Sequence, residues 1–258
     1  IGKTGQDLLG DFVVKDLTRL GIDVSGVRRS AIHATSLTYI LNVKGQDRRY
    51  LHAIGANSDF SLTDVDLSML SRARVLYVGG YLVMPRWEPD DLASLFREAK
   101  RLGLMTVLDV VIGAGSPASL SSVEPVLPYT DLFLPNHDEA QALTGRDAPL
   151  SQAEILSHLS TIAITLGREG VLVRSKDRVF RAGAYAVESV DESGAGDAFA
   201  AGFIIGLIEQ WPLEQTLRFA SAVGASCTRA LGCTEGVLHF DAALAFVAHN
   251  PLKIARLG

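Results

Sequence analysis

The chain has 258 residues, 48% of them hydrophobic, which is enough apolar material for one large folded core. Its 24 basic and 29 acidic side chains give a net charge of -5 without any Lys/Arg block, so no nucleic-acid partner is expected. The most apolar stretch, residues 198–208, holds two glycines and is too short to cross a membrane, so no membrane partner is expected either.

The start of the chain predicts a helix within a longer sequence. The first residue is Ile1 rather than Met, and a helical pattern follows at once, so we expect further residues upstream. Apolar side chains share one face over residues 6–20, and Gly21 follows them. This pattern predicts an amphipathic helix that stops at the glycine.

Two strand-like segments, residues 35–43 and 48–54, flank a turn-like sequence at residues 44–47. Together they predict a β-hairpin over residues 35–54. Both segments are less apolar than the strands further along, so we expect one face of this hairpin to lie in water. Exposed strand edges favour pairing, so a homodimer formed through this hairpin is also an expectation.

From residue 75 onward, short apolar runs alternate with helical segments. The runs cover residues 75–78, 106–111, 132–134 and 161–166, and the clearest helix covers residues 90–102. Continuous apolar strands between helices predict a parallel sheet with helices on both faces. We further expect a second hairpin at residues 170–182 and helices at residues 195–209, 212–230 and 241–249. The predicted fold class is α/β, as a single domain over residues 1–258 that includes the small 35–54 hairpin.

The most informative segment is Asp191–Phe199, with the sequence DESGAGDAF. A strand-like run ends near Val190, and a helix rich in Ala and Gly begins near Ala195. Small residues and free N–H groups at a helix start suit a phosphate. An acid there would repel phosphate, so Asp197 needs its own purpose, such as taking the proton of an acceptor hydroxyl while the Gly194–Gly196 amides hold the developing charge. The alternative is that Asp197 only caps the helix.

Two further turns follow predicted strands, at the strand ends where α/β sheets bind ligands. Asn136 and Glu139 lie three residues apart after the 132–134 strand, and an amide with a carboxylate suits hydrated Mg²⁺. The alternative is a pair of helix-capping residues. In the turn of residues 165–170, glycines would let a nucleotide approach and Arg168 would meet a phosphate. The alternative is a plain turn with a solvated arginine.

In order and spacing, these three segments resemble the ribokinase-like family of carbohydrate kinases, also called the phosphofructokinase-B family. Residues 191–197 are similar to its second signature, Asp-x-Thr-Gly-Ala-Gly-Asp, residues 136–139 to its Asn-x-x-Glu motif, and residues 165–170 to its Thr-x-Gly-x-x-Gly nucleotide turn. The resemblance extends over essentially the whole chain. It implies a ribokinase-like fold and an ATP-dependent kinase acting on a hydroxyl of a small sugar of the ribose, fructose or keto-sugar class. The hairpin 35–54 would be its lid.

The resemblance also implies roles for single residues. Asp197 would be the catalytic base, and the anion hole would consist of Gly194, Ala195 and Gly196. ATP and Mg²⁺ would lie against cofactor-binding residues, namely Asn136, Glu139, Thr165, Gly167, Arg168, Gly170 and Gly224. Glu139 would hold Mg²⁺ through water. Asp191, with backbone carbonyls of residues 229–236, would bind K⁺, although Glu192 adds a charge near this loop that weighs against that inference.

The sequence departs from the family pattern in two places. Glu192 and Ser193 stand where small or hydroxyl residues and then Thr are usual, and Ser193 keeps the hydroxyl. The family's first-strand aspartate, which binds sugar hydroxyls, and the Gly-Gly motif that follows in its lid region are not found in this sequence. This again leads us to expect residues upstream of Ile1.

The sequence is also compatible with other functions. A nucleoside kinase of the same family and a non-catalytic relative that senses nucleotide or sugar are alternatives. Residues 2–4, Gly-Lys-Thr before a helix, match the tail of a P-loop, but no acidic strand end follows at a fitting distance.

The two cysteines, Cys227 and Cys233, lack a metal-site spacing, so we expect reduced thiols and a cytoplasmic location.

Overall fold

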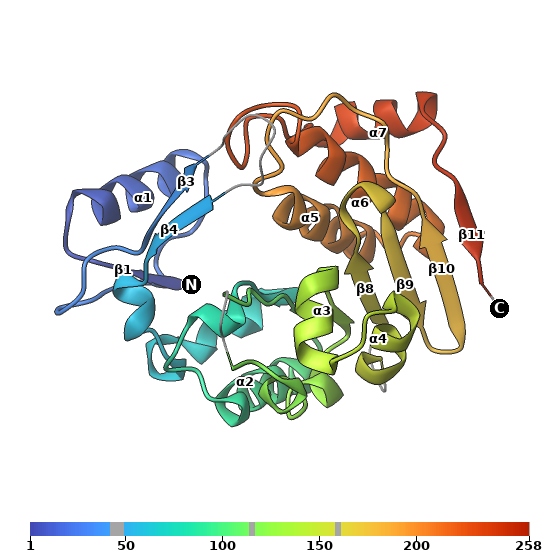
Figure 1. Ribbon diagram of the computed structural model, residues 1–258. Coiled ribbons are helices and arrows are strands. Elements are labelled where there is room, and N and C mark those ends of the chain that lie inside the picture. The colour runs from blue at the N-terminus through green and yellow to red at the C-terminus, as the bar shows by residue number, and fades with distance from the viewer. Residues whose placement is uncertain (42–48, 114–116, 158–160, 258) are drawn as a thin grey trace. The chain divides into compact units, whose positions relative to one another are not determined.

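The computed structural model describes residues 1–41, 49–113, 117–157 and 161–257 (Figure 1). The chain forms two compact units, Ile1–Tyr129 and Thr130–Gly258. The single domain expected from the sequence therefore stays a prediction. Across the described ranges, no helix combines the length and the apolar character needed to span a bilayer.

The first unit contains paired strands and two α-helices among its described residues. Strand β1 (Gly2–Thr4) pairs in parallel with β2 (Val27–Arg29), β3 (Leu37–Leu41) pairs antiparallel with β4 (Arg49–Ala53), and β5 (Val75–Val78) pairs in parallel with β6 (Met105–Leu108). The helices are α1 (Leu8–Arg19) and α2 (Pro89–Arg101). The parallel β5–β6 pair follows the prediction, whereas the short strand β2 was not expected.

Helix α1 forms where the sequence predicted a helix. The carboxylate of its N-cap, Asp7, accepts the N–H of Gly10 at 2.8 Å, and the chain leaves the helix at Gly21, whose φ is 78°. The apolar face of this helix is not buried, however, because the side chains of Leu8 and Phe12 are 87% and 65% exposed. Periodicity predicted the helix correctly, but the described residues leave its apolar face uncovered.

Strands β3 and β4 confirm the predicted hairpin, while its turn, residues 44–47, lies outside the described residues. The expectation that only one face of this hairpin meets water was wrong. Every residue of β4 is exposed, and none of β3 is buried. A two-stranded sheet buries a face only where another layer packs on it, and no described element does so here. The homodimer through this hairpin stays a prediction.

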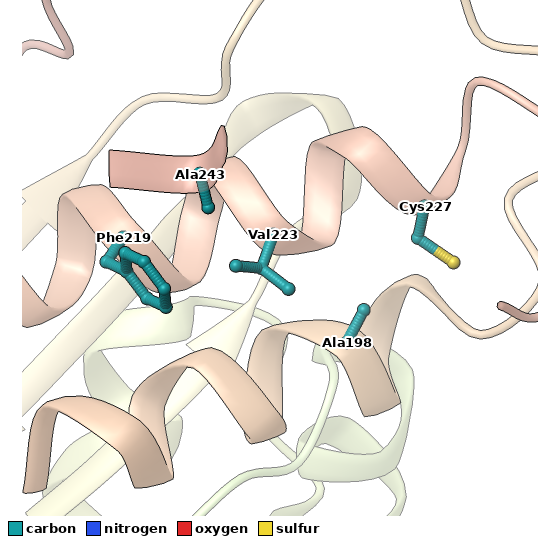
Figure 2. Packing of buried hydrophobic residues seen from close by; sticks show 5 residues of the cluster. All are labelled: Ala198, Phe219, Val223, Cys227 and Ala243. Atoms are coloured by element: carbon teal, nitrogen blue, oxygen red, sulfur yellow. The ribbon is translucent and has the colours of Figure 1, made fainter. Parts of the chain in front are cut away.

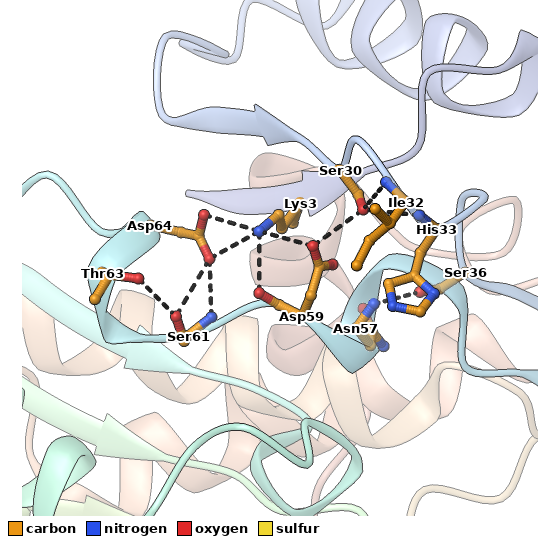
Figure 3. A network of polar contacts seen from close by, with 10 residues as sticks. All are labelled: Lys3, Ser30, Ile32, His33, Ser36, Asn57, Asp59, Ser61, Thr63 and Asp64. Carbon is orange, nitrogen blue, oxygen red and sulfur yellow. Dashed lines mark hydrogen bonds and ion pairs between the residues drawn. The ribbon is translucent and has the colours of Figure 1, made fainter.

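A polar network around Lys3, on β1, links distant parts of the first unit (Figure 3). The Lys3 ammonium lies 3.0 Å from the Asp64 carboxylate and 3.2 Å from that of Asp59, and its side chain is 11% exposed. Burial opposes the charge on Lys3, but hydrogen bonds and the charges of Asp64 and Asp59 outweigh it and raise the lysine pKa. Burial likewise works against the Asp59 carboxylate, yet hydrogen bonds from Lys3 and Ser30 lower its pKa. The charges therefore stabilise one another.

We expect Lys3→Met to lower the free energy of unfolding by about 1–3 kcal/mol, because two partly buried carboxylates would lose their cation. The pKa of Asp59 is lowered in the folded state, so this stabilisation is present at neutral pH and is lost as pH falls through that pKa. Urea titrations at several pH values measure the effect. The control is Lys15→Met on the exposed side of α1, and an equal loss in both variants would contradict the prediction.

The second unit joins one parallel strand pair to an antiparallel extension, and Figure 1 shows the extension. Strand β7 (Leu132–Phe133) pairs in parallel with β8 (Thr161–Thr165), and β8, β9 (Val171–Ser175), β10 (Arg178–Ala182) and β11 (Ile254–Arg256) follow as antiparallel neighbours. The helices are α3 (His137–Thr144), α4 (Pro149–Leu156), α5 (Ala195–Ile208), α6 (Leu213–Cys227) and α7 (Phe240–His249). The second predicted hairpin is thus confirmed as β9 and β10, whereas α4 and β11 were not predicted.

The strand expected to end near Val190 was a wrong prediction. No strand occurs in residues 183–190, all of which the structure describes. Instead, the backbone N–H groups of Val190 and Asp191 donate to the Thr228 carbonyl at 2.7 and 3.2 Å, just beyond the end of α6. An apolar run becomes a strand only beside another strand edge, and this run meets a helix end.

Helices α5 and α6 pack closely because small residues face each other. A Cβ on Gly202 of α5 would lie 2.7 Å from the Cα of Ala220 on α6, so only glycine permits this approach. The same helices and α7 contribute a buried cluster, shown in Figure 2, of Ala198, Phe219, Val223, Cys227 and Ala243. Because Ala198 belongs to this core, the first turn of α5 is held in place directly beside Asp197.

Candidate active site

The N-terminus of α5 is preceded by a turn that requires glycine. The N-cap, Gly194, has a φ of 77°, in the left-handed region. A Cβ at this position would also lie 2.7 Å from the carbonyl oxygen and 2.8 Å from the Cα of Cys233. Backbone conformation and close approach therefore both demand glycine here, and together they set the direction in which α5 begins.

The first turn of α5 has backbone N–H groups that no side chain caps. No side chain caps α5 at Gly194, and among the described residues no acceptor is found for the N–H groups of Gly196 and Asp197. The N–H of Ala195, which was expected in the anion hole, instead donates to the Glu192 carbonyl at 3.3 Å. Helices α1 and α3, in contrast, are capped by Asp7 and Asn136. Unpaired N–H groups at a helix start, reinforced by the helix dipole, bind anions. The first turn of α5 therefore offers donors that suit a phosphoryl group.

Asp197 lies in this first turn and is reachable by solvent. Within the described ranges its carboxylate has neither a hydrogen bond nor an ion pair, so it does not cap α5, as the alternative from the sequence would require. The surrounding protein partly desolvates the carboxylate and so raises its pKa above that of an ordinary aspartate. An accessible carboxylate of raised basicity is suited to accepting a proton.

The loop before Gly194 is braced by the Asp191 side chain, which is buried. One carboxylate oxygen accepts the N–H and the hydroxyl of Ser193 at 3.0 and 2.7 Å, and the other accepts the N–H of Gly232 at 3.1 Å. The residue that the resemblance assigned to K⁺ thus links this loop to the segment after α6. The K⁺ role itself stays a prediction.

A buried thiol takes part in the same framework. The Sγ atom of Cys227 lies 3.4 Å from the Ser193 carbonyl oxygen and 3.2 Å from that of Cys233, close enough for its S–H to donate to either. Both cysteines are free thiols, as predicted. Sequence reasoning missed the contacts of Cys227, because a cysteine that touches a carbonyl 34 residues away leaves no local pattern.

Asn136 and Glu139 cap helix α3. The Asn136 side-chain oxygen accepts the Glu139 N–H at 2.9 Å, and the Glu139 carboxylate accepts the Asn136 N–H at 2.8 Å. This is the alternative that the spacing left open. A carboxylate that accepts one N–H keeps further lone pairs, so the same Glu139 can also face a hydrated cation. Over the part of the chain that the structure describes, no trio of metal-ligating side chains is gathered.

The turn of residues 165–170 lies beside Asn136. Thr165, at the end of β8, forms a parallel bridge with Asn136. Gly167 has a φ of 56°, and no atom would meet a Cβ there, so this side of the turn is open. Gly170 is needed for packing instead, because its Cβ would overlap the Ala182 carbonyl on β10 at 2.1 Å.

Gly224 of α6, which the resemblance placed beside the nucleotide, packs against α5. A Cβ there would lie 3.2 Å from the Ala195 carbonyl oxygen and 3.2 Å from the Phe199 Cβ. Helix packing therefore accounts for this glycine, and its contact with a nucleotide stays a prediction.

Arg168 and Glu192 connect the nucleotide-like turn with the loop before α5. The guanidinium lies 3.4 Å from the Glu192 carboxylate, and the two side chains are 83% and 46% exposed. Together with the bridge between Asn136 and Thr165, this ion pair brings the three sequence motifs into one place in the second unit. The added charge of Glu192 therefore meets a counter-ion, which sequence reasoning did not foresee.

Comparisons with known proteins show what this chain is similar to. The profile of the family described as pfkB family carbohydrate kinase matches residues 1–239. The chain is 27% identical to the ribokinase of Haemophilus influenzae over 255 residues, which cover 95% of this chain and 79% of that protein. It is 26% identical to an uncharacterized sugar kinase of Archaeoglobus fulgidus over 241 residues, which cover 92% of this chain and 93% of that protein.

A solved structure shows the same fold. Arabidopsis thaliana ribokinase complexed with ribose and ATP superposes with a TM-score of 0.80 at 20% identity, covering 96% of this chain and 80% of that one. The predicted fold class, a ribokinase-like α/β fold with a mostly parallel central sheet, is thereby confirmed.

Proposed function

This chain belongs to the pfkB family of carbohydrate kinases, and we propose that it transfers the γ-phosphate of ATP to a hydroxyl of a small sugar, with Asp197 as the base. The observation that carries the proposal is the uncapped first turn of α5, where free N–H groups and an accessible carboxylate lie side by side. A helix start with only a structural role does not need free N–H groups beside a carboxylate, since the carboxylate lowers the affinity of the N–H groups for an anion. A phosphotransferase needs both.

In the proposed reaction, Asp197 accepts the proton of the acceptor hydroxyl as that oxygen forms its bond to the γ-phosphorus. The bond from phosphorus to the bridging oxygen breaks, and ADP leaves with the electron pair. The N–H groups of Gly196 and Asp197 donate to the phosphoryl oxygens, whose charge is spread during transfer. Gly194 and Asp191 act earlier, by holding these donors in place before the substrates bind.

The remaining motif residues fit the nucleotide and its cation. The open side of Gly167 and the accessible guanidinium of Arg168 suit the approach of ATP phosphates. Asn136 and Glu139 present an amide and a carboxylate, the oxygen ligands or water-mediated contacts that Mg²⁺ prefers. When bound, Mg²⁺ supplies positive charge to the phosphates. The residues present therefore fit MgATP.

The acceptor is proposed as a sugar of the ribose or fructose class, on the strength of relatives such as the Haemophilus influenzae ribokinase. ATP consumption by the purified protein is measured against ribose, fructose, keto-sugars and nucleosides. We expect turnover with at least one sugar. Turnover with nucleosides alone would favour a nucleoside kinase, and MgATP binding without turnover on any acceptor would favour a sensor.

Glu139→Gln separates helix capping from cation binding, because the glutamine oxygen can still accept the Asn136 N–H. We expect the Mg²⁺ concentration for half-maximal activity to rise about 10-fold, as for other residues that act on a metal indirectly, with Tm nearly unchanged. Glu139→Ala should raise it similarly and also lower stability by about 1 kcal/mol through the lost cap. A Mg²⁺ titration that is identical for Glu139→Gln and wild type would leave Glu139 as a cap alone.

A further inference from the structure

Glu192 stands in the loop that braces the start of α5, and its carbonyl accepts the Ala195 N–H at 3.3 Å, but its side chain takes no part in the bracing. Its neighbours Asp191 and Ser193 are buried and bonded to one another, whereas the Glu192 side chain is 46% exposed. It reaches the Arg168 guanidinium, 24 residues earlier, at 3.4 Å. The Glu192 carboxylate therefore directs the Arg168 guanidinium toward the loop before Gly194.

The ion pair between Arg168 and Glu192 is weak enough for another anion to replace the Glu192 carboxylate. A separation of 3.4 Å is longer than the usual 2.7–2.9 Å of a charge-assisted hydrogen bond, and the Arg168 side chain is 83% exposed. Ion pairs of this kind contribute about 0.2–1 kcal/mol. A nucleotide phosphate carries more charge than one carboxylate and matches the guanidinium fork equally well, so it can replace Glu192 as the partner.

We propose that Glu192 competes with the nucleotide for Arg168, so that the phosphates of ATP displace the Glu192 carboxylate when they bind. This inference rests on the proposed kinase function and adds to it a residue that sets nucleotide affinity. Glu192 touches neither the acceptor nor the transferred phosphoryl group in this scheme. It acts through Arg168, by holding the guanidinium in the free protein.

The test is a double-mutant cycle on the Kd of MgATP, measured by titration calorimetry with the whole chain. Glu192→Gln should tighten binding by about 1.4–5-fold, the equivalent of the energy of an exposed pair. Arg168→Met should weaken binding, and adding Glu192→Gln to Arg168→Met should then change nothing. The matched control is Glu169→Gln in the same turn, which breaks the 3.3 Å pair of the exposed Glu169 with the half-buried Arg181 of β10 and should leave Kd unchanged.

Two outcomes would overturn this inference while leaving the proposed kinase function intact. One is a Kd that does not change in Glu192→Gln. The other is an equal tightening in the wild-type and Arg168→Met backgrounds, which would mean that Glu192 repels the nucleotide directly. A wild-type protein that neither binds MgATP nor phosphorylates any sugar would overturn the proposed function, and this inference with it.

Discussion

Asp197→Asn should lower kcat by about 10²–10⁴-fold while leaving the Kd of MgATP nearly unchanged. Asparagine keeps the shape of the side chain and the N–H groups of the α5 first turn, but it cannot accept the proton of the acceptor hydroxyl. The matched control is Asp241→Asn, which removes a carboxylate from the first turn of α7. Steady-state kinetics with near-normal kcat in Asp197→Asn would refute the base assignment.

The raised pKa of Asp197 leads to two further expectations, one for the pH dependence of activity and one for stability. The base works deprotonated, so kcat/KM should fall toward acid pH, beginning at a higher pH than for an ordinary aspartate. A carboxyl whose pKa is raised on folding costs stability once the pH exceeds that pKa. At neutral pH, Asp197→Asn should therefore raise Tm slightly. A variant that is inactive because it is misfolded would show a lower Tm instead.

Gly194→Ala should lower the free energy of unfolding by about 2–5 kcal/mol, from a left-handed backbone and a collision with Cys233. Because relief of that collision would turn the α5 N–H groups away from the phosphoryl oxygens, kcat should also fall by at least about 10²-fold. Urea titration and kinetics on protein that remains folded at low temperature measure the two effects separately.

Gly145→Ala is the matched control for this variant. Gly145, after α3, has a φ of 66°, close to the 77° of Gly194, but no atom would meet its Cβ. It should lose only the backbone contribution, about 1–2 kcal/mol, with kcat unchanged. Equal losses of stability and activity in both variants would show that the contact with Cys233 does not matter for the site.

Features that depend on residues close together in the chain could be predicted from the sequence. The helix of residues 8–19, the hairpin of β9 and β10, and the opening of α5 at Ala195 all follow from periodicity, turn residues and small side chains within a few positions. The same holds for the candidate base and anion hole, because residues 194–197 are contiguous and carry their own chemistry.

Features that depend on residues far apart could not be predicted. The segment before Val190 has an apolar pattern typical of a strand, yet whether it pairs is decided by Thr228, which it meets only after folding. Glycine at position 170 is required by Ala182, and Arg168 finds Glu192 across 24 residues. Periodicity also says which face of α1 is apolar, but not whether anything covers it.

By itself, the sequence determined which groups are available for the proposed phosphoryl transfer, since the Gly-Ala-Gly-Asp segment holds donors and acid in one helical turn. Only the tertiary structure decided their state: α5 is uncapped, Asp197 is without a partner among the described residues and has a raised pKa, and Asn136 and Glu139 cap α3. The physical reason is that capping, burial and ion pairing depend on three-dimensional neighbours, whereas residue chemistry and local conformational preference are properties of the chain.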